Sequence, residues 1–445
     1  MTGLSRRATL LGAGALLAAP PLVERAGAQS AFDWRRFRGE RIEVSVQTSP
    51  RGALLTQHNR EFEELTGIRA GVEVVPEQQH RQKIIIEYAS GRPSFDVGEV
   101  SLHVNKRQVG RARWNTDIRA LIADTQLTAP DFDFDDFGAG MRAYATQADG
   151  RMDTLPAFAD YFILYYNKEL LAARNIAVPT TFDEMFESAK RLADPSRQVF
   201  GHVGRGLKNA NVVLWSTYLL GTAQRDMVDA NRQLVTDTPD AIWAGQQYQR
   251  FLSEVSPPGS IGFNWNECQT TFMQGRAAMW IDGIGFAAPL EDPARSRVAG
   301  KVGYAVVPRG PESHHCALFG AGYGIPEASR KKGPAWLYLQ WALGKQMQLK
   351  MLAAGAGVPA RASPFRDESF IGQSRFPREF FSTLERSAPI ARAGLPEIVP
   401  VTEFRDVIGT ALTNCIGKGP GEVERELRAA TAAFRPVLER SEREG

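Results

Sequence analysis

Acidic side chains at two places in this 445-residue chain could carry chemistry. Asp282 follows the apolar run 277–281 and precedes Gly283, so it stands at the end of a predicted strand. A carboxylate there accepts hydrogen bonds from a hydroxylated ligand, or it caps a helix. Asp160 is the second acid. If both faced one cleft, they could serve as the two carboxylates of a glycoside hydrolase, but their spacing does not require it.

Two other motifs are weak indications of a ligand or metal site. The glycine-rich run 320–324 resembles a phosphate-binding loop, but Ile325-Pro326 follows it where such a loop would begin a helix. The neighbouring His-His-Cys at 314–316 is a poor metal site, because adjacent residues in a loop rarely converge on one ion. The chain also lacks the Gly-x-Ser-x-Gly and Cys-x-x-Cys motifs. We therefore expect no catalytic residue, no metal and no cofactor.

Residues 1–28 have the three parts of an export signal: the pair Arg6-Arg7, an apolar run at 10–22, and a small-residue exit at 26–28. The arginine pair predicts the twin-arginine route, although Thr9 departs from its usual pattern. An anchor is the alternative, but the apolar run is shorter than the ~20 residues that span a bilayer. No lipid-attachment cysteine stands nearby, since the first cysteine is Cys268. We expect an untethered periplasmic protein.

Composition narrows the function classes further. The 53 basic and 50 acidic residues nearly balance, and without residues 1–28 they become 50 and 49. A nucleic-acid or membrane-surface partner needs a clear basic excess, so we expect neither. About 415 residues beyond the signal favour two lobes. Three cysteines leave at least one thiol unpaired.

The elements that must position the acids follow from hydrophobic periodicity. The first part of the chain alternates strands and helices, with strands at 42–46, 72–75 and 95–97 and helices at 53–66 and 78–90. This alternation predicts a parallel, doubly wound sheet. Later we expect helices at 181–192, 211–220, 240–254 and 334–349, and a strand at 301–307. Thr181 and Glu184 form a predicted capping box for the first of these helices.

Two stretches together resemble a known family. The first combines Asp149-Gly150-Arg151, Leu155-Pro156 and the run Leu-Tyr-Tyr-Asn-Lys-Glu-Leu at 164–170. The second combines Pro-Pro-Gly at 257–259, Phe-Asn-Trp-Asn-Glu at 263–267, Phe-Met-Gln-Gly-Arg-Ala-Ala-Met-Trp-Ile-Asp at 272–282 and Lys-Val-Gly-Tyr at 301–304. Their order and spacing are similar to family 1 extracellular solute-binding proteins of ABC importers, and within that family to sorbitol- and mannitol-type polyol and sugar binders.

The resemblance implies an α/β, two-lobed type II periplasmic-binding-protein fold, each lobe a doubly wound sheet flanked by helices, with the ligand in the cleft between the lobes. Chain crossings are then expected near 156–161, 308–318 and 357–364. The N-terminal lobe would comprise 29–156 plus 318–358, and the C-terminal lobe 157–317 plus 359–445.

The resemblance also implies a set of cleft residues, each with a structural alternative such as a cap, a hinge bond, core packing or a solvated loop. The expected ligand contacts are Asp282, Asp160, Arg361, Phe319, Phe158, Asn266, Ser101, His103, Gln47, Arg205 and Asn211. Ala321 stands where the family often has a second aromatic residue, which implies a roomier or differently shaped pocket.

The leading hypothesis is a monomeric periplasmic binding protein that captures a polyol or sugar and delivers it to the transmembrane subunits of an ABC permease, without catalysis. An exported glycoside hydrolase is the alternative from another class. A third possibility keeps the fold but changes the solute to a polyamine, an oligosaccharide or a phosphorylated glycerol.

Overall fold

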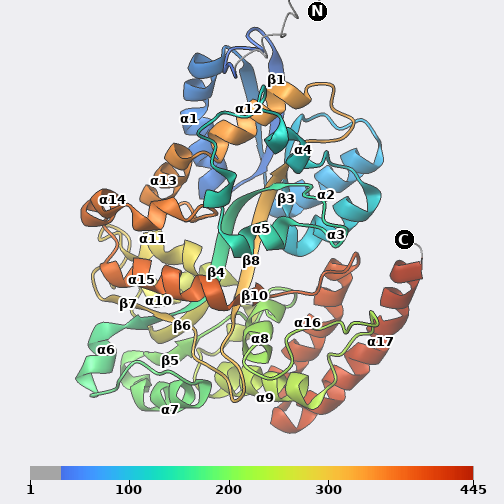
Figure 1. Cartoon of the computed structure of the whole chain (residues 1–445). Helices are drawn as coiled ribbons and strands as arrows, with labels where there is room; N and C mark the ends of the chain where they lie inside the picture. Colours follow the sequence, from blue (N-terminus) through green and yellow to red (C-terminus); the bar gives the residue numbers. More distant parts are fainter. Residues whose placement is uncertain (1–31, 444–445) are drawn as a thin grey trace, which may run out of the picture. The chain divides into compact units, whose positions relative to one another are not determined.

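One long strand, β4 (Leu155–Asn167), belongs to two β-sheets in succession (Figure 1). The structure, a computed structural model, describes residues 32–443, so the predicted export signal lies outside it. Tyr161 of β4 pairs with Leu318 in the first sheet, and the next residue, Phe162, pairs with Gly283 in the second. Every residue of β4 is buried except the half-buried Asp160. A strand that is covered on both faces has a nearly continuous apolar sequence, as β4 does.

The first sheet has the order β2-β1-β3-β8-β4. Its strands are β1 (Arg41–Gln47), β2 (Arg69–Val75), β3 (Val97–Ser101), β8 (Cys316–Gly324) and the first half of β4, with the short β9 (Val358–Pro359) and β10 (Ala391–Ala393) alongside. Strands β1, β2 and β3 are parallel, as the sequence predicts. Strand β8 runs antiparallel to both β3 and β4, so the sheet as a whole is mixed.

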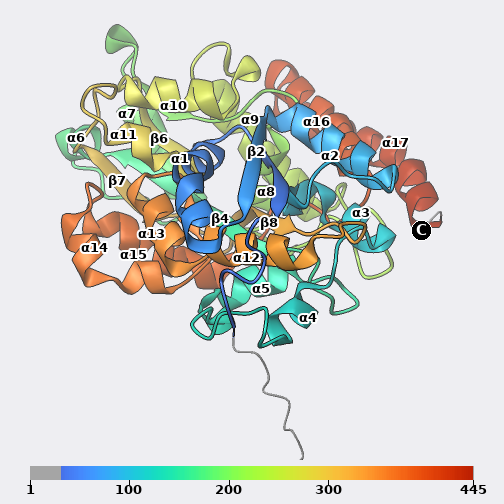
Figure 2. The same ribbon diagram turned by 90° about the horizontal axis from the view of Figure 1, so that it is seen from above.

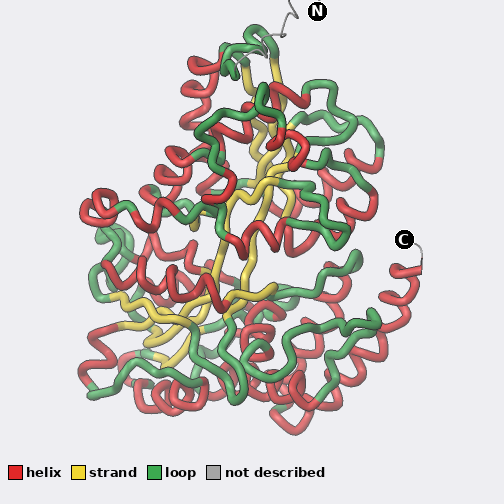
Figure 3. The backbone as a smooth tube through the Cα atoms, in the orientation of Figure 1, coloured by secondary structure: helices red, strands yellow, loops and turns green. Residues whose placement is uncertain are grey.

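The second sheet is built on the remaining half of β4. Its other strands are β5 (Phe200–Val203), β6 (Ala277–Gly283) and β7 (Val302–Val306). Both β6 and β7 pair with β4 in antiparallel fashion, and β5 extends the sheet as a parallel neighbour of β6. Figure 3 shows β4 and β8 running on from the first sheet toward the second.

Helices cover both sheets (Figure 2). In chain order they are α1 (Pro50–Thr66), α2 (Glu77–Ala89), α3 (Leu102–Ala112), α4 (Ile118–Ala123), α5 (Ala139–Ala145), α6 (Lys168–Ala173), α7 (Phe182–Leu192), α8 (Val212–Leu219), α9 (Pro239–Glu254), α10 (Trp265–Met273), α11 (Ala287–Leu290), α12 (Lys332–Ala342), α13 (Lys345–Ala353), α14 (Glu368–Gln373), α15 (Arg378–Ser387), α16 (Val401–Lys418) and α17 (Val423–Arg443). Helices α1 and α12 pack on each other and on the first sheet, which α2 and α3 also contact. Helices α8, α9, α16 and α17 pack together beside the second sheet.

Two predicted details differ from the structure. The helix expected at 334–349 is two helices, α12 and α13, separated at Leu343 and Gly344. In the capping box, the Thr181 hydroxyl accepts from the Glu184 N–H as expected (3.1 Å). The Glu184 carboxylate, however, accepts from the N–H and hydroxyl of Thr180 (both 2.8 Å), because that neighbour offers two donors.

Close approach of backbones explains the glycines of β8. A Cβ at Gly320 would lie 2.6 Å from the carbonyl oxygen of Phe158 on β4. One at Gly322 would lie 2.4 Å from the hydroxyl of Thr154. The run 320–324 is therefore extended strand packed against β4, which explains why it is no phosphate loop.

Candidate functional site

A cavity of about 750 Å³ lies where the two sheets meet. Its wall combines the ends of β1 and β3 and the starts of α1 and α3 with the middle of β4, the loop after β5 and the start of α10. The sequence-predicted residues that line it are Gln47, Ser101, His103, Phe158, Asp160, Arg205 and Phe319.

Gln47 and Ser101 supply neutral polar groups from the carboxyl ends of neighbouring strands. The Gln47 amide donates to the Ser101 hydroxyl (Nε2–Oγ 2.8 Å). The same hydroxyl accepts from Nε of Arg81, which reaches over from α2 (3.1 Å). Two donors therefore occupy the lone pairs of Ser101, and its own proton is left to donate.

His103 is held as a neutral imidazole. Nη2 of Arg81 lies 3.2 Å from its Nε2, and because arginine can only donate, Nε2 accepts. Nδ1 then carries the hydrogen and donates to the Gly320 carbonyl (3.3 Å). Burial, together with the positive charges of Arg81, Arg405 and Arg205, holds the pKa of His103 well below its usual range.

Asp160 and Glu99 are the cavity's inner carboxylates. Asp160 accepts from the N–H of Gly285 (2.9 Å), which joins β4 to the turn after β6. Burial, reinforced by the charge of Asp282, raises the pKa of Asp160 to about 6, against the opposing effects of the Gly285 N–H, Arg51 and Arg205. Glu99 accepts from the Gln47 N–H through Oε2 (3.0 Å), and burial raises its pKa. Its Oε1 has no hydrogen-bond partner among the described residues.

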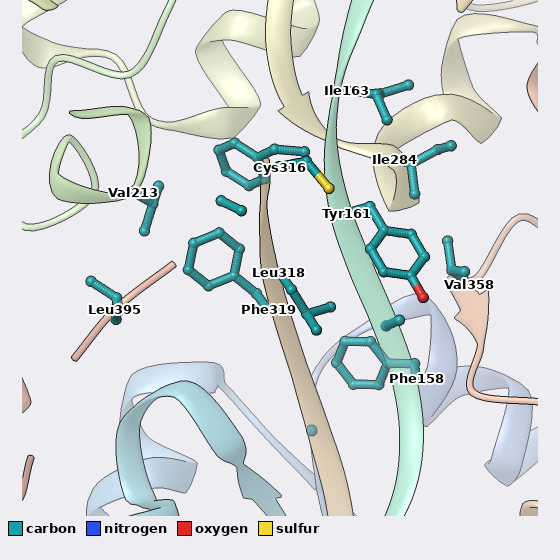
Figure 4. Packing of buried hydrophobic residues seen from close by; sticks show 14 of the residues in the cluster. Phe158, Tyr161, Ile163, Val213, Ile284, Cys316, Leu318, Phe319, Val358 and Leu395 are labelled. Atoms are coloured by element: carbon teal, nitrogen blue, oxygen red, sulfur yellow. The ribbon is translucent and has the colours of Figure 1, made fainter. Parts of the chain in front are cut away.

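Aromatic rings form the apolar part of the wall. Figure 4 shows Phe158 on β4 and Phe319 on the adjacent β8. The Arg51 guanidinium lies over the Phe158 ring, 3.4 Å from its centroid. Phe319 packs against Phe162 and meets the His103 ring edge to face, with centroids 5.0 and 5.5 Å away. Both rings are largely buried, so they offer a ligand only part of a face.

Arg205 is clamped to Asp282. Its Nε donates to Oδ2 of Asp282 (2.8 Å), and Nη2 donates to Oδ1. The guanidinium also lies 5.5 and 5.7 Å from the ring centroids of Phe162 and Phe286. Asp282 itself is fully buried, and its Oδ1 also accepts from the Gly283 N–H (2.8 Å).

Four predicted contacts do not line the cavity. Asp282 lies behind the wall, with its carboxylate taken up by Arg205. Arg361 is buried and donates to the carbonyls of Phe132, Asp133 and Leu343, which pins a loop near α5. Asn211 donates to the Gly409 carbonyl and the Thr413 hydroxyl, tying α8 to α16. Asn266 is exposed and donates to Glu267. In each case another group of the protein forms hydrogen bonds with the side chain.

The structure also brings residues to the cavity that the sequence analysis did not single out. Charged residues among them are Arg51, Glu77, Arg81, Glu99, Lys208, Asp292, Arg295, Arg375 and Arg405. For Glu99 a sequence clue exists, because an acid inside an apolar strand is rarely buried without a role. For the arginines the sequence gives no such clue, because an arginine in a helical stretch is equally consistent with an exposed position.

The catalytic and metal alternatives find little geometric support. Of the two acids that the sequence suggests for a hydrolase, Asp160 lines the cavity and Asp282 lies behind its wall, paired with Arg205. His314 and His315 donate to the separate carbonyls of Val307 and Ile390, and the thiol of Cys316 lies 3.4 Å from the Ser387 carbonyl. Cys268, Cys316 and Cys415 are all buried, free thiols.

The family follows from comparison with known proteins. The model of the bacterial extracellular solute-binding protein family matches residues 47–349, more than half of the chain. The chain belongs to this family. This solute-binding protein is 26% identical to an erythritol/L-threitol-binding protein of Mycolicibacterium smegmatis, over 84% of the chain and 81% of the relative. It is 27% identical to a probable amino-acid ABC transporter periplasmic-binding protein of Sinorhizobium fredii, over 83% and 84%.

A solved structure supports the same assignment. The solute-binding protein resembles an ABC transporter solute-binding protein of Agrobacterium radiobacter, solved in complex with ribitol, with a TM-score of 0.80 and 25% identity. The match covers 90% of this chain and 99% of that one. The two-lobed type II fold predicted from the sequence is confirmed. No helix within the described residues is long and apolar enough to cross a membrane.

Proposed function

We propose that this solute-binding protein captures a polyol or sugar in the cavity between its two sheets and delivers it to the permease of an ABC importer. The observation that carries this proposal is one cavity whose wall combines hydroxyl-binding groups from both sheets with aromatic rings. Its volume of about 750 Å³ lies within the ~300–1,000 Å³ range of small-ligand pockets.

Different residues would bind the donor and acceptor sides of a ligand hydroxyl and its carbon frame. Ser101 donates and Asp160 accepts, which matches the dual character of a hydroxyl group. Charge-assisted hydrogen bonds contribute ~1.5–3 kcal/mol each, so a few of them discriminate between stereoisomers. The ring of Phe158 and the edge of Phe319 contact the carbon frame.

Domain closure would complete the site. We place the N-terminal lobe at 29–156 plus 318–358, and the C-terminal lobe at 157–317 plus 359–445. In the first sheet β4 pairs with β8 as far as Tyr161 and with β9 at Phe158 and Ala159, which supports a chain crossing near 156–161. The ligand would stabilise the closed state because only that state contacts it from both lobes. No bond is made or broken.

Residues 1–28 would direct the folded monomer to the periplasm by the twin-arginine route. The Arg6-Arg7 pair supports this assignment. Replacing both arginines by lysine should leave the protein in the cytoplasm, as fractionation and immunoblotting would detect. Undiminished export of that variant would contradict the route.

A thermal-shift screen tests the function. The panel contains erythritol, ribitol, mannitol, monosaccharides, disaccharides, glycerol phosphate, polyamines and amino acids. At 100 times its Kd a true ligand adds ~2.7 kcal/mol of stability. We expect a shift from a polyol or sugar and no turnover of a chromogenic glycoside. A shift from polyamines or amino acids alone, or steady hydrolysis of the glycoside, would overturn the proposal.

A further inference from the structure

Three arginines from separate elements meet around the cavity. Arg81 comes from α2, Arg205 from the loop after β5, and Arg405 from α16. The positive charges of all three arginines act on His103, whose ring is neutral, and Arg81 contacts it directly. A neutral polyol can use these guanidinium groups only as hydrogen-bond donors, whereas an anionic ligand also gains from their charge.

Two of the three arginines are balanced by carboxylates. Arg81 forms an ion pair with Glu77 one helical turn away (2.5 Å), and its Nε donates to Ser101. Arg205 is clamped by Asp282. These contacts fix both guanidinium groups in place, while Nη1 of Arg205 has no acceptor within residues 32–443.

Arg405 has no ion-pair partner among the described residues. Its Nε donates to the Asn209 carbonyl (3.1 Å), and in the described part of the chain neither of its Nη groups meets an acceptor. The neighbouring Asp406 is turned to the Asn209 amide (3.2 Å) and to Lys208 (3.6 Å). Burial and the positive charges of Arg81 and Arg205 lower the pKa of Arg405 to about 9. Without a ligand, the positive charge of Arg405 is therefore repelled by those of Arg81 and Arg205.

Basic side chains outnumber acidic ones in the wall of the cavity, where seven cations (Arg51, Arg81, Arg205, Lys208, Arg295, Arg375 and Arg405) stand with four acids (Glu77, Glu99, Asp160 and Asp292). Glu77 and Asp282 offset Arg81 and Arg205, and His103 is neutral. Asp160 and Glu99 share Arg51, whose charge acts on both carboxylates. Arg405 is half-buried and has no ion-pair partner among the described residues, so an anionic ligand would supply a counter-charge that the protein itself does not.

We propose that the cavity binds a polyhydroxylated acid, with its anionic group held by Arg405 and the free edge of Arg205 and its hydroxyls held by Ser101 and Asp160. This inference rests on the proposed function and narrows its ligand class. A guanidinium presents paired N–H donors that match a carboxylate or a phosphate. The shared chemistry is an oxyanion at the end of a polyol chain.

Matched ligands test the proposal. D-Gluconate and sorbitol 6-phosphate each differ from sorbitol at one terminal carbon, at opposite ends of the chain, and D-ribonate and ribitol 5-phosphate differ from ribitol in the same way. Calorimetry at low and high salt should show an acid binding about 10- to 100-fold more tightly than its neutral partner. Its affinity should fall with salt while that of the neutral ligand stays constant. The carboxylate and phosphate arms identify the source of the oxyanion.

The variant Arg405→Gln should lose this preference, so that the acid and its neutral partner bind it with similar affinities. Arg428→Gln removes an exposed cation from α17 and serves as the control. Circular dichroism checks that both variants are folded, and Arg405→Lys, which keeps the charge, should retain part of the preference. Equal or tighter binding of the neutral partners would overturn the inference and leave the proposed function standing. If no member of either series binds, the inference fails, and the proposed function is decided separately by the thermal-shift panel of polyols and sugars.

Discussion

Arg205 and Asp282 form an ion pair across the wall of the cavity, with Nε of the arginine 2.8 Å from Oδ2 of the fully buried carboxylate. The pair joins the loop after β5 to the end of β6, two neighbouring strands of the second sheet. Asp282 therefore acts through Arg205, which alone of the two lines the cavity. Asp282, which the sequence predicts to contact the ligand, lies behind the cavity wall and fixes the position of Arg205.

Replacing Asp282 by alanine should weaken both the fold and the site. The change leaves the Arg205 cation between two phenylalanine rings without its partner. Breaking a buried pair on one side costs about 3 kcal/mol or more. We expect that loss in urea unfolding, and at least tenfold weaker ligand binding by calorimetry.

A matched control separates this effect from simple removal of charge. Asp183 pairs with Arg250 on the surface and its side chain is 79% exposed. Such a pair contributes ~0–1 kcal/mol, so Asp183→Ala should change little. Equal losses from the two substitutions would show that the buried pair has no special role.

Asp160 should make stability depend on pH. Its pKa is about 6 in the folded protein against an ordinary 3.8, chiefly because of burial. The folded state thus holds the proton more tightly than the unfolded chain. The free energy of unfolding should therefore fall as pH rises from about 4 to about 6, with no further contribution above that range.

Urea titrations of the wild type and of Asp160→Asn between pH 4 and pH 7 measure this effect. The variant should show a shallower dependence, with a residual slope of the same sign from Glu99, whose pKa burial also raises. Parallel curves for the two proteins would show that Asp160 titrates normally.

Much of the fold could be predicted from local patterns. The alternation at 42–46, 53–66 and 72–75 has the periods of strand and helix, and β1, α1 and β2 lie there. Residues at the ends of strands could be predicted as well, because a parallel sheet brings those ends to one edge. Gln47 and Ser101 indeed line the cavity.

The partners of long side chains could not be predicted in the same way. Arg361 and Arg205 have the same chemistry, yet one pins a buried loop and the other reaches the cavity. Arg405 stands on a helix about 200 positions beyond its contact at Asn209. Which acceptor lies closest depends on packing between distant segments, and local periodicity carries no information about it.

Arg361 should matter for stability and not for binding. Its guanidinium donates to three backbone carbonyls and lies 4.1 Å from the centroid of the Phe137 ring, with 1% of the residue exposed. Arg361→Ala leaves these carbonyls unpaired, at about 1–3 kcal/mol for each buried group. We expect a lower melting temperature with unchanged Kd at a temperature where the variant is folded. A raised Kd there would place Arg361 in the site after all.

Ser101 should contribute to affinity through its proton. Its oxygen already accepts from Gln47 and Arg81, so the hydroxyl is oriented to donate to a ligand. Ser101→Ala removes that donor and frees two protein donors from their acceptor. We expect affinity to fall about tenfold, since a hydrogen bond of ~1–1.5 kcal/mol is lost. Calorimetry should show no change for Ser382→Ala, which removes an exposed hydroxyl from α15. If both serine variants bind as the wild type does, the Ser101 hydroxyl holds Arg81 in place without contacting the ligand.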